Sequence, residues 1–127
     1  MSRDFIVCVD DEQAVLNQLS AHLTRRFGAT HLVECAESAE EALALIPELQ
    51  ASGEVQLVIC DQVMPGMKGD RCLEIVSRQW PEIMKVLLTG QAGPVTVGRV
   101  VREWGDSLRA TAWHVPRARA RSGDRRR

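Results

Sequence analysis

Residues 56–69 read QLVICDQVMPGMKG, and this stretch is the most specific pattern in the chain. The first five residues are apolar after Gln56 and lack polar alternation, which is typical of a strand buried on both faces of a parallel sheet. Asp61 follows the run directly, and Pro65 between Met64 and Gly66 indicates a turn. A helical pattern then extends from about Gly69 to Gln79. The stretch therefore predicts a buried strand with an acidic end, a turn and a helix.

The same alternation of strand and helix extends outward on both sides. Short apolar runs predict strands over residues 5–9, 31–35, 56–60 and 84–88. Apolar residues at helical spacing predict a helix over 15–27, and a capping box, Ser38 with Glu41, opens a second helix that Ser52-Gly53 closes. Because crossovers between parallel strands are right-handed, the helices cover both faces of one sheet. The fold class is therefore α/β, a doubly wound parallel sheet.

Length and composition fit this class and exclude several others. The 127 residues suit one domain, and 45% hydrophobic with 26% charged residues is a globular composition. The four cysteines, at 8, 35, 60 and 72, form no C-x-x-C pair, which argues against a disulfide framework or a zinc site. The first three are expected to be small core residues. The chain shows no signal-peptide pattern and no membrane span, so a cytoplasmic location without membrane contact is expected.

Acidic residues stand where the predicted strands end. Asp10 and Asp11 follow the first strand, Asp61 follows the third, and Thr89 follows the fourth. Ligand sites of such sheets lie at the carboxyl ends of the strands, so these residues are expected to meet there. Clustered carboxylates repel one another unless a hard cation such as Mg²⁺ neutralises them, and a carboxylate can attack phosphorus. A plainer alternative is that Asp10 or Asp11 only caps the first helix.

Three runs carry a family resemblance. They read IVCVDDE from residue 6, LVICDQVMPGMKGD from residue 57 and KVLLTG from residue 85. They resemble the receiver domains of two-component response regulators in both residue pattern and spacing, over roughly residues 4–103. The resemblance implies a flavodoxin-like, CheY-like (βα)5 fold. It also implies a signalling phosphoacceptor rather than an enzyme.

The resemblance further implies a role for each residue of the site. Asp61 would accept a phosphoryl group from a histidine kinase or a phosphotransfer protein. Asp11 and Asp61 would bind Mg²⁺ directly, Asp10 mainly through water, and the backbone carbonyl of Val63 would be another ligand. The downstream partner would be a protein that the sequence does not name.

The match weakens toward the C-terminus. By the resemblance, Thr89 would hydrogen-bond the phosphoryl oxygens and Gly90 would leave room for them. Receivers then have a Lys-Pro pair after a fifth strand, yet Thr111, Ala112 and Trp113 stand near that place, and no lysine follows residue 85. The lysine contact to the phosphoryl group and the usual aromatic switch residue are both missing. The fifth strand and fifth helix are therefore expected to be altered or incomplete.

This change divides the chain into three parts. The receiver domain is expected over 1–108, a divergent fifth strand over 109–115, and a disordered basic tail over 116–127. Residues 99–127 carry nine arginines against three acids, whereas 1–98 carry seven basic and fourteen acidic residues. Three explanations of this end stay open: a frameshift, which we favour, a divergent receiver, or an added basic arm.

Two other functions are weighed against the phosphoacceptor. A pseudo-receiver would keep the fold as a protein-interaction module that phosphorylation does not switch, and the missing lysine favours it. A phosphotransferase similar to the haloacid dehalogenases would need an aspartate at 63, where valine stands. Nucleic acid is not expected as a partner, because the basic tail lacks interleaved aromatic residues. A second copy of the chain, giving a homodimer, is a further candidate partner.

Overall fold

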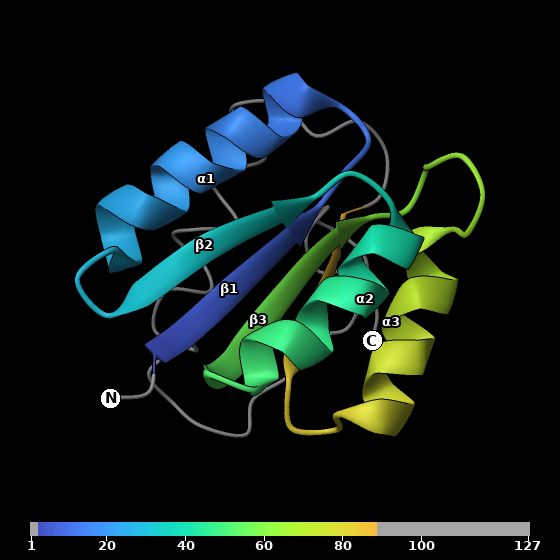
Figure 1. The fold of residues 1–127 in the computed structure, drawn as a ribbon. Helices are drawn as coiled ribbons and strands as arrows, with labels where there is room; N and C mark the ends of the chain where they lie inside the picture. Colours follow the sequence, from blue (N-terminus) through green and yellow to red (C-terminus); the bar gives the residue numbers. More distant parts are fainter. Residues whose placement is uncertain (1–2, 89–127) are drawn as a thin grey trace, which may run out of the picture.

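The computed structural model describes residues 3–88, and these form four strands and three helices in strict alternation (Figure 1). The strands are β1 (Arg3–Val9), β2 (His31–Ala36), β3 (Gly53–Asp61) and β4 (Met84–Leu88). The helices are α1 (Gln13–Phe27), α2 (Ala39–Gln50) and α3 (Gly69–Gln79). Every strand and helix predicted from the sequence in this range is present.

The four strands form one parallel sheet in the order β2-β1-β3-β4. The chain moves from β1 out to β2 and then back across β1 to β3 and β4, so the order reverses between β1 and β3. This reversal is the point at which doubly wound sheets place their ligands. The predicted α/β fold class is confirmed.

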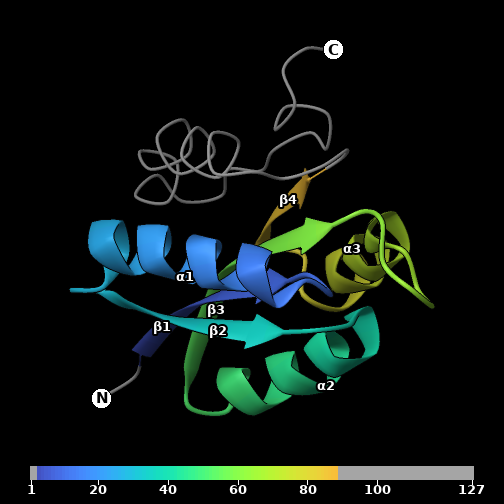
Figure 2. The same ribbon diagram turned by 90° about the horizontal axis from the view of Figure 1, so that it is seen from above.

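Helices cover both faces of the sheet (Figure 2). Helix α1 packs on one face through Leu16, Leu19 and Leu23 against Ile6 and Ile59 of the central strands. Helices α2 and α3 pack on the other face of the sheet. They contact the strand residues that alternate with those facing α1. Successive residues of β1 and β3 thus point into two different cores, which explains why residues 5–9 and 57–60 are apolar without polar alternation.

Strand β2 is less buried than its sequence predicts. It lies at an edge of the sheet, and Leu32 is 39% exposed. Cys35 is exposed as well, so the expectation that it is a core residue is wrong. An edge strand has a neighbour on one side alone, and its apolar pattern does not reveal this position. Cys8, Cys60 and Cys72 are buried.

Several element boundaries also differ from the sequence prediction. Helix α2 continues through Pro47 to Gln50, and Gly53 begins β3 instead of closing the helix. Strands β1 and β3 are longer than their apolar runs because Arg3 pairs with Gly53 and Asp4 with Glu54. Pairing between strands extends them into polar residues, which hydrophobic patterning alone does not detect.

Several predicted features lie outside residues 3–88. These are Thr89, Gly90, the residues near the expected lysine position, the fifth strand over 109–115 and the tail over 116–127. In the part of the chain that is described, no helix combines the length and apolar character needed to span a membrane.

Candidate functional site

Three carboxylates gather at the carboxyl end of the sheet. One oxygen from each of Asp10, Asp11 and Asp61 lies within 4.8 Å of the other two. Asp10 is 3% exposed and Asp61 is 8% exposed, whereas Asp11 faces solvent. Asp10 and Asp11 follow β1 and Asp61 ends β3, so the reversal of strand order brings them together. The predicted meeting of these three side chains is confirmed.

Asp10 is positioned by the connection from β1 to α1. Its backbone N–H donates to the carbonyl of Ala36 at 3.1 Å, which ties the end of β1 to the end of β2. Its Oδ1 accepts from the backbone N–H of Glu12 at 2.9 Å. Glu12 is the N-cap residue of α1 and makes no side-chain cap. Asp10 thus supports the entry to α1 without capping it, and its second oxygen remains for other contacts.

Asp61 is held by the neighbouring strand and by the loop that follows. The N–H of Gln62 donates to the carbonyl of Leu88 at 2.9 Å, so the chain beyond Asp61 stays attached to β4. The N–H of Gly69 donates to the carbonyl of Gln62 at 3.1 Å and closes the loop on itself. A Cβ at position 69 would lie 2.2 Å from the carbonyl oxygen of Asp61. Only glycine permits this close approach of α3 to the end of β3.

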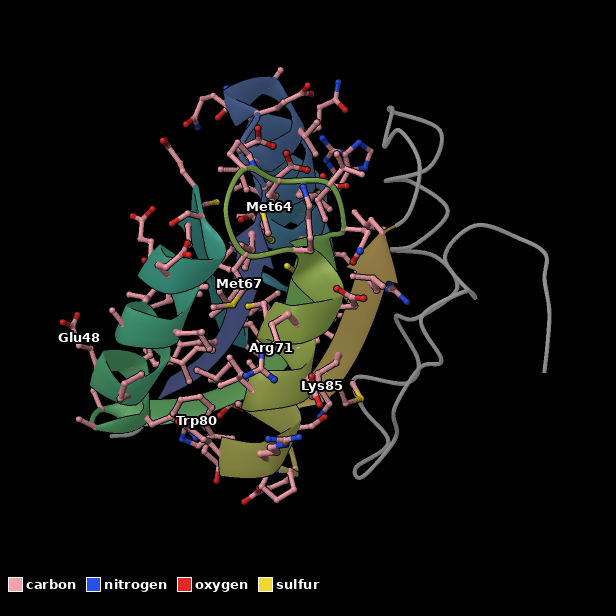
Figure 3. All side chains as sticks on the ribbon, turned by 90° about the vertical axis from the view of Figure 1, so that its right-hand side faces the viewer. Glu48, Met64, Met67, Arg71, Trp80 and Lys85 are labelled. Carbon is pink, nitrogen blue, oxygen red and sulfur yellow. The ribbon has the colours of Figure 1, made fainter. Side chains whose placement is uncertain are left out.

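The rest of the loop is also restrained. Gly66 has a φ of 77°, a left-handed conformation that glycine adopts at no steric cost. Met64 is buried in the core beneath α2 and α3, and Met67 packs against the same core (Figure 3). Lys68 donates from Nζ to the carbonyl of Met64 at 3.0 Å. The loop that carries Asp61 and Val63 is therefore anchored at several points.

Charge repulsion and burial both act on the acidic cluster. Burial raises the pKa of Asp61 from 3.8 to about 6, and the Asp10 carboxylate adds to this, whereas the backbone amides of Val63 and Gln62 oppose it. Burial also raises the pKa of Asp10. The hydrogen bond from the Glu12 N–H lowers it, and the charges of Asp11 and Glu12 raise it further. Without a cation, the two buried carboxyls keep their protons to a higher pH than an ordinary aspartate does. A cation would relieve the same repulsion.

The donor set fits a hard divalent cation. Oxygen ligands at a site with one or two buried carboxylates, open to water on one side, are what Mg²⁺ prefers in proteins. Asp11 supplies the exposed side, and Val63, which is 64% exposed, lies two residues after Asp61 in the same loop. Thr89 and Gly90, expected to complete the phosphate pocket, lie outside the described residues.

Neither lysine of the chain takes the place of the missing one. Lys68 is engaged within the loop, and Lys85 donates from Nζ to the carbonyl of Ile83. Lys85 is the second residue of β4, toward the strand's amino end, and Figure 3 shows it well away from Met64 in the loop. Burial lowers the pKa of Lys85. The acidic cluster therefore receives no lysine from residues 3–88.

Sequence reasoning missed one residue that builds the site. Gln62 accepts a 2.7 Å hydrogen bond at Oε1 from the backbone N–H of Asp70 and so caps α3, whose N-cap residue Lys68 makes no side-chain cap. Gly69 is the first residue of α3, as predicted, and it also makes the close approach to Asp61. The sequence shows only that a polar residue, Gln62, directly follows the acidic end of the strand. It does not show that the side chain of Gln62 caps α3 at Asp70.

Comparisons with known proteins agree with this geometry. The sequence matches the family profile described as response regulator receiver domain over residues 6–105. It is 32% identical over 100 residues to the hydrogenase transcriptional regulatory protein HoxA of Cupriavidus necator, which covers 79% of this chain. The chain spans 19% of the length of that relative.

Solved structures show the same fold. A CheY-like response regulator receiver domain protein from Methanospirillum hungatei is 24% identical with a TM-score of 0.66, covering 85% of this chain and 95% of that one. The response regulator TrrA of Thermotoga maritima, solved in complex with Mg²⁺ and BeF, is 29% identical with a TM-score of 0.56, covering 72% of each chain. With the fold, the acidic cluster and the profile in agreement, this chain belongs to the family of response regulator receiver domains.

Proposed function

We propose that this chain is a phosphoacceptor, which takes a phosphoryl group onto Asp61 from the phosphohistidine of a histidine kinase or phosphotransfer protein. The observation that carries the proposal is the convergence of Asp10, Asp11 and Asp61, two of them buried, at the carboxyl end of the sheet. A structural role would not need three carboxylates within 4.8 Å of one another. Buried like charges destabilise a fold, and functional sites are where they are retained.

The chemistry follows from the position of Asp61. An Oδ of its carboxylate attacks phosphorus, the bond from phosphorus to the histidine nitrogen breaks, and an acyl phosphate forms. This requires the ionised carboxylate, and a pKa of about 6 leaves that form dominant at neutral pH. Backbone amides of Gln62 and Val63 favour the ionised form.

We assign Mg²⁺ to the acidic cluster as part of this proposal. Asp11 and Asp61 would hold it directly, Asp10 mainly through water, and the carbonyl of Val63 would be a further ligand. When bound, Mg²⁺ supplies positive charge that offsets the carboxylates and the incoming phosphoryl oxygens. The crystal complex of the Thermotoga maritima relative with Mg²⁺ and BeF supports the assignment.

The proposal extends to residues outside 3–88. Thr89 would hydrogen-bond the phosphoryl oxygens, Gly90 would leave room for them, and the receiver domain would span 1–108. A cytoplasmic location belongs to the same proposal, since the four free thiols suit a reducing compartment. Catalysis would be limited to the chain's own phosphorylation and dephosphorylation.

The test is phosphorylation by acetyl phosphate with Mg²⁺, followed by intact-mass measurement. We expect one phosphoryl adduct that hydroxylamine removes, as it does for an acyl phosphate. The Asp61→Asn variant should lose the adduct, whereas Asp70→Asn, at an exposed aspartate in the first turn of α3, should retain it. An adduct that persists in the Asp61→Asn variant would contradict the assignment.

A second function is favoured by one specific observation. No lysine follows Lys85, and both lysines of the chain are hydrogen-bonded to backbone carbonyls, so phosphorylation lacks the lysine that would couple it to the rest of the domain. In a pseudo-receiver, partner binding would not depend on phosphate. Beryllofluoride, a phosphoryl mimic, would then bind at Asp61 and barely shift the amide NMR signals of residues 97–115. Large shifts there would instead show a working switch, with Arg109 the first residue to mutate.

A further inference from the structure

The four cysteines, scattered in the sequence, form two pairs in the structure. Cys8 of β1 and Cys35 of β2 are register partners on neighbouring parallel strands. Cys60 of β3 and Cys72 of α3 lie in the same buried cluster on the opposite face of the sheet. All four are free thiols. The phosphoacceptor chemistry uses none of them.

The register of Cys8 and Cys35 gives a Cα spacing that is compatible with a disulfide. Register partners on adjacent strands point to the same face, and β1 and β2 run side by side in Figure 1. Neighbouring strands lie about 4.8 Å apart. Disulfides join Cα atoms separated by roughly 4.4–6.8 Å. The spacing of the two strands therefore falls within the Cα range of disulfides.

The two members of this pair differ in access to solvent. Cys35 is exposed because β2 is an edge strand, and Cys8 is fully buried. A hydrogen bond with Cys8 lowers the pKa of Cys35, whereas partial burial and the charge of Glu34 act to raise it. The thiolate is the form that reacts with oxidants. Cys35 is thus an accessible nucleophile with a second thiol held next to it.

We propose that Cys8 and Cys35 are a redox modification site, which a hydroperoxide converts into an intramolecular disulfide. The Cys35 sulfur attacks the peroxide, the O–O bond breaks, and a sulfenic acid forms with release of water or an alcohol. The Cys8 thiol then attacks the Cys35 sulfur, and the hydroxyl leaves as water with the thiol proton. Two thiols are oxidised by two electrons and one peroxide is reduced. A dithiol reductant reverses the step.

The position of this pair connects it to the acidic edge. Cys8 lies two residues before Asp10, and Cys35 precedes Ala36, whose carbonyl accepts the Asp10 N–H. A bond between the sulfurs would clamp the ends of β1 and β2 directly beside that contact. The inference holds whether or not Asp61 accepts a phosphoryl group, because it depends only on the two strands.

The test uses the full chain and hydrogen peroxide at low molar excess. We expect a mass loss of about 2 Da, for two hydrogens, and a single cross-linked peptide pair containing Cys8 and Cys35. Dithiothreitol should restore the original mass. Cys60 and Cys72 serve as internal controls, because both are buried, and they should remain reduced.

Variants separate the steps. Cys35→Ser should abolish the cross-link, and Cys72→Ser should leave it unchanged. Cys8→Ala should stop at the sulfenic acid, detected by dimedone labelling of Cys35. A cross-link between Cys60 and Cys72, an intermolecular bond through Cys35, or progressive overoxidation of Cys35 in the unmodified chain would each overturn the proposal. Peptide mapping of the unmodified chain decides the matter even if a variant fails to fold.

Discussion

The two ends of the sheet bury polar side chains to the same extent and use them in opposite ways. His31, at the amino end, is 8% exposed, and Asp61, at the carboxyl end, is also 8% exposed. Together with Asp10 they are the buried polar or charged residues found within 3–88. Burial alone therefore does not distinguish a structural polar group from a functional one.

The amino end is internally satisfied. Nδ1 of His31 shares a 2.8 Å hydrogen bond with Thr30, and Nε2 shares another of 2.8 Å with Gln56. Gln56 in turn donates to Asp4 at 3.1 Å. The His31 ring also meets Phe27 edge-on. Each member of this group, which spans all three of the first strands and the end of α1, has a partner.

The carboxyl end is not satisfied in the same way. Its three carboxylates face one another, and their burial and mutual repulsion raise the pKa values of Asp10 and Asp61. The difference teaches that the partners of a buried group decide its role. A buried polar group with complementary partners stabilises the fold, whereas buried like charges need a cation that comes from outside.

The largest expected effect concerns Mg²⁺ binding at the carboxyl end. Asp11→Ala should abolish a calorimetric Mg²⁺ titration, and Asp10→Ala should weaken it, because few protein oxygens are available as ligands. Glu48→Gln, at an exposed glutamate of α2, is the matched control and should bind as the unmodified chain does. An unchanged Mg²⁺ titration for Asp11→Ala would show that the cation does not bind at the acidic cluster.

The next effect is that substitutions at the two ends of the sheet should change the free energy of unfolding in opposite directions. In the absence of Mg²⁺, Asp10→Asn should raise the free energy of unfolding by about 1–2 kcal/mol, since it removes a buried charge and keeps the oxygen that accepts from Glu12. His31→Ala should lower it by about 1–3 kcal/mol, because Gln56 and Thr30 lose their partner. Urea unfolding measures both.

If both substitutions lowered the free energy of unfolding, the contrast between the two ends of the sheet would not hold. If Asp10→Asn is as destabilising as His31→Ala, then Asp10 is a structural residue like its counterpart. Added Mg²⁺ should narrow the gap between the unmodified chain and Asp10→Asn, because a cation relieves the repulsion that the substitution removes.

A smaller effect is the pH dependence of stability at the carboxyl end. The folded pKa of Asp61, about 6, lies above the ordinary value of 3.8, so the folded state binds a proton that the unfolded chain releases between these values. Without Mg²⁺, the Asp61 carboxylate therefore destabilises the fold fully above pH 6, and less as the pH falls toward 4. Asp61→Asn should be more stable than the unmodified chain at pH 8, and the gap should shrink at pH 5.

The control for this measurement is again Glu48→Gln, which should not change the pH profile. A stability gap that stays constant from pH 8 to pH 5 would show that Asp61 keeps an ordinary pKa in the folded chain.

The smallest expected effect compares one glutamine at each end. Gln56→Ala should cost about 1–2 kcal/mol, because it disconnects His31 from Asp4 in a partly buried network. Gln62→Ala should cost about 0.5–1 kcal/mol, the usual value of an exposed helix cap. Thermal unfolding measures both, with Gln79→Ala, exposed at the end of α3, as control. A larger cost for Gln62 than for Gln56 would mean that the loop carrying Asp61 depends strongly on this cap.

Much of the fold could be predicted because its signals are local. The apolar runs of β1, β3 and β4 and the capping box at Ser38, whose side chain accepts from the N–H of Glu41 at 3.0 Å, were read correctly from neighbouring residues. The acidic strand ends were also visible, since parallel strands of one sheet end at one edge.

The sequence by itself therefore determined the order of elements, the α/β class and the identity of the acidic residues. The tertiary structure decided which strand lies at the edge, which made Cys35 exposed, and which residues contact across the chain. The partners of His31, the pairing of Cys8 with Cys35, the cap from Gln62 to Asp70 and the raised pKa of Asp61 all depend on these contacts. The physical reason is range: periodicity and capping act over a few residues, whereas burial, register and repulsion join residues distant in sequence.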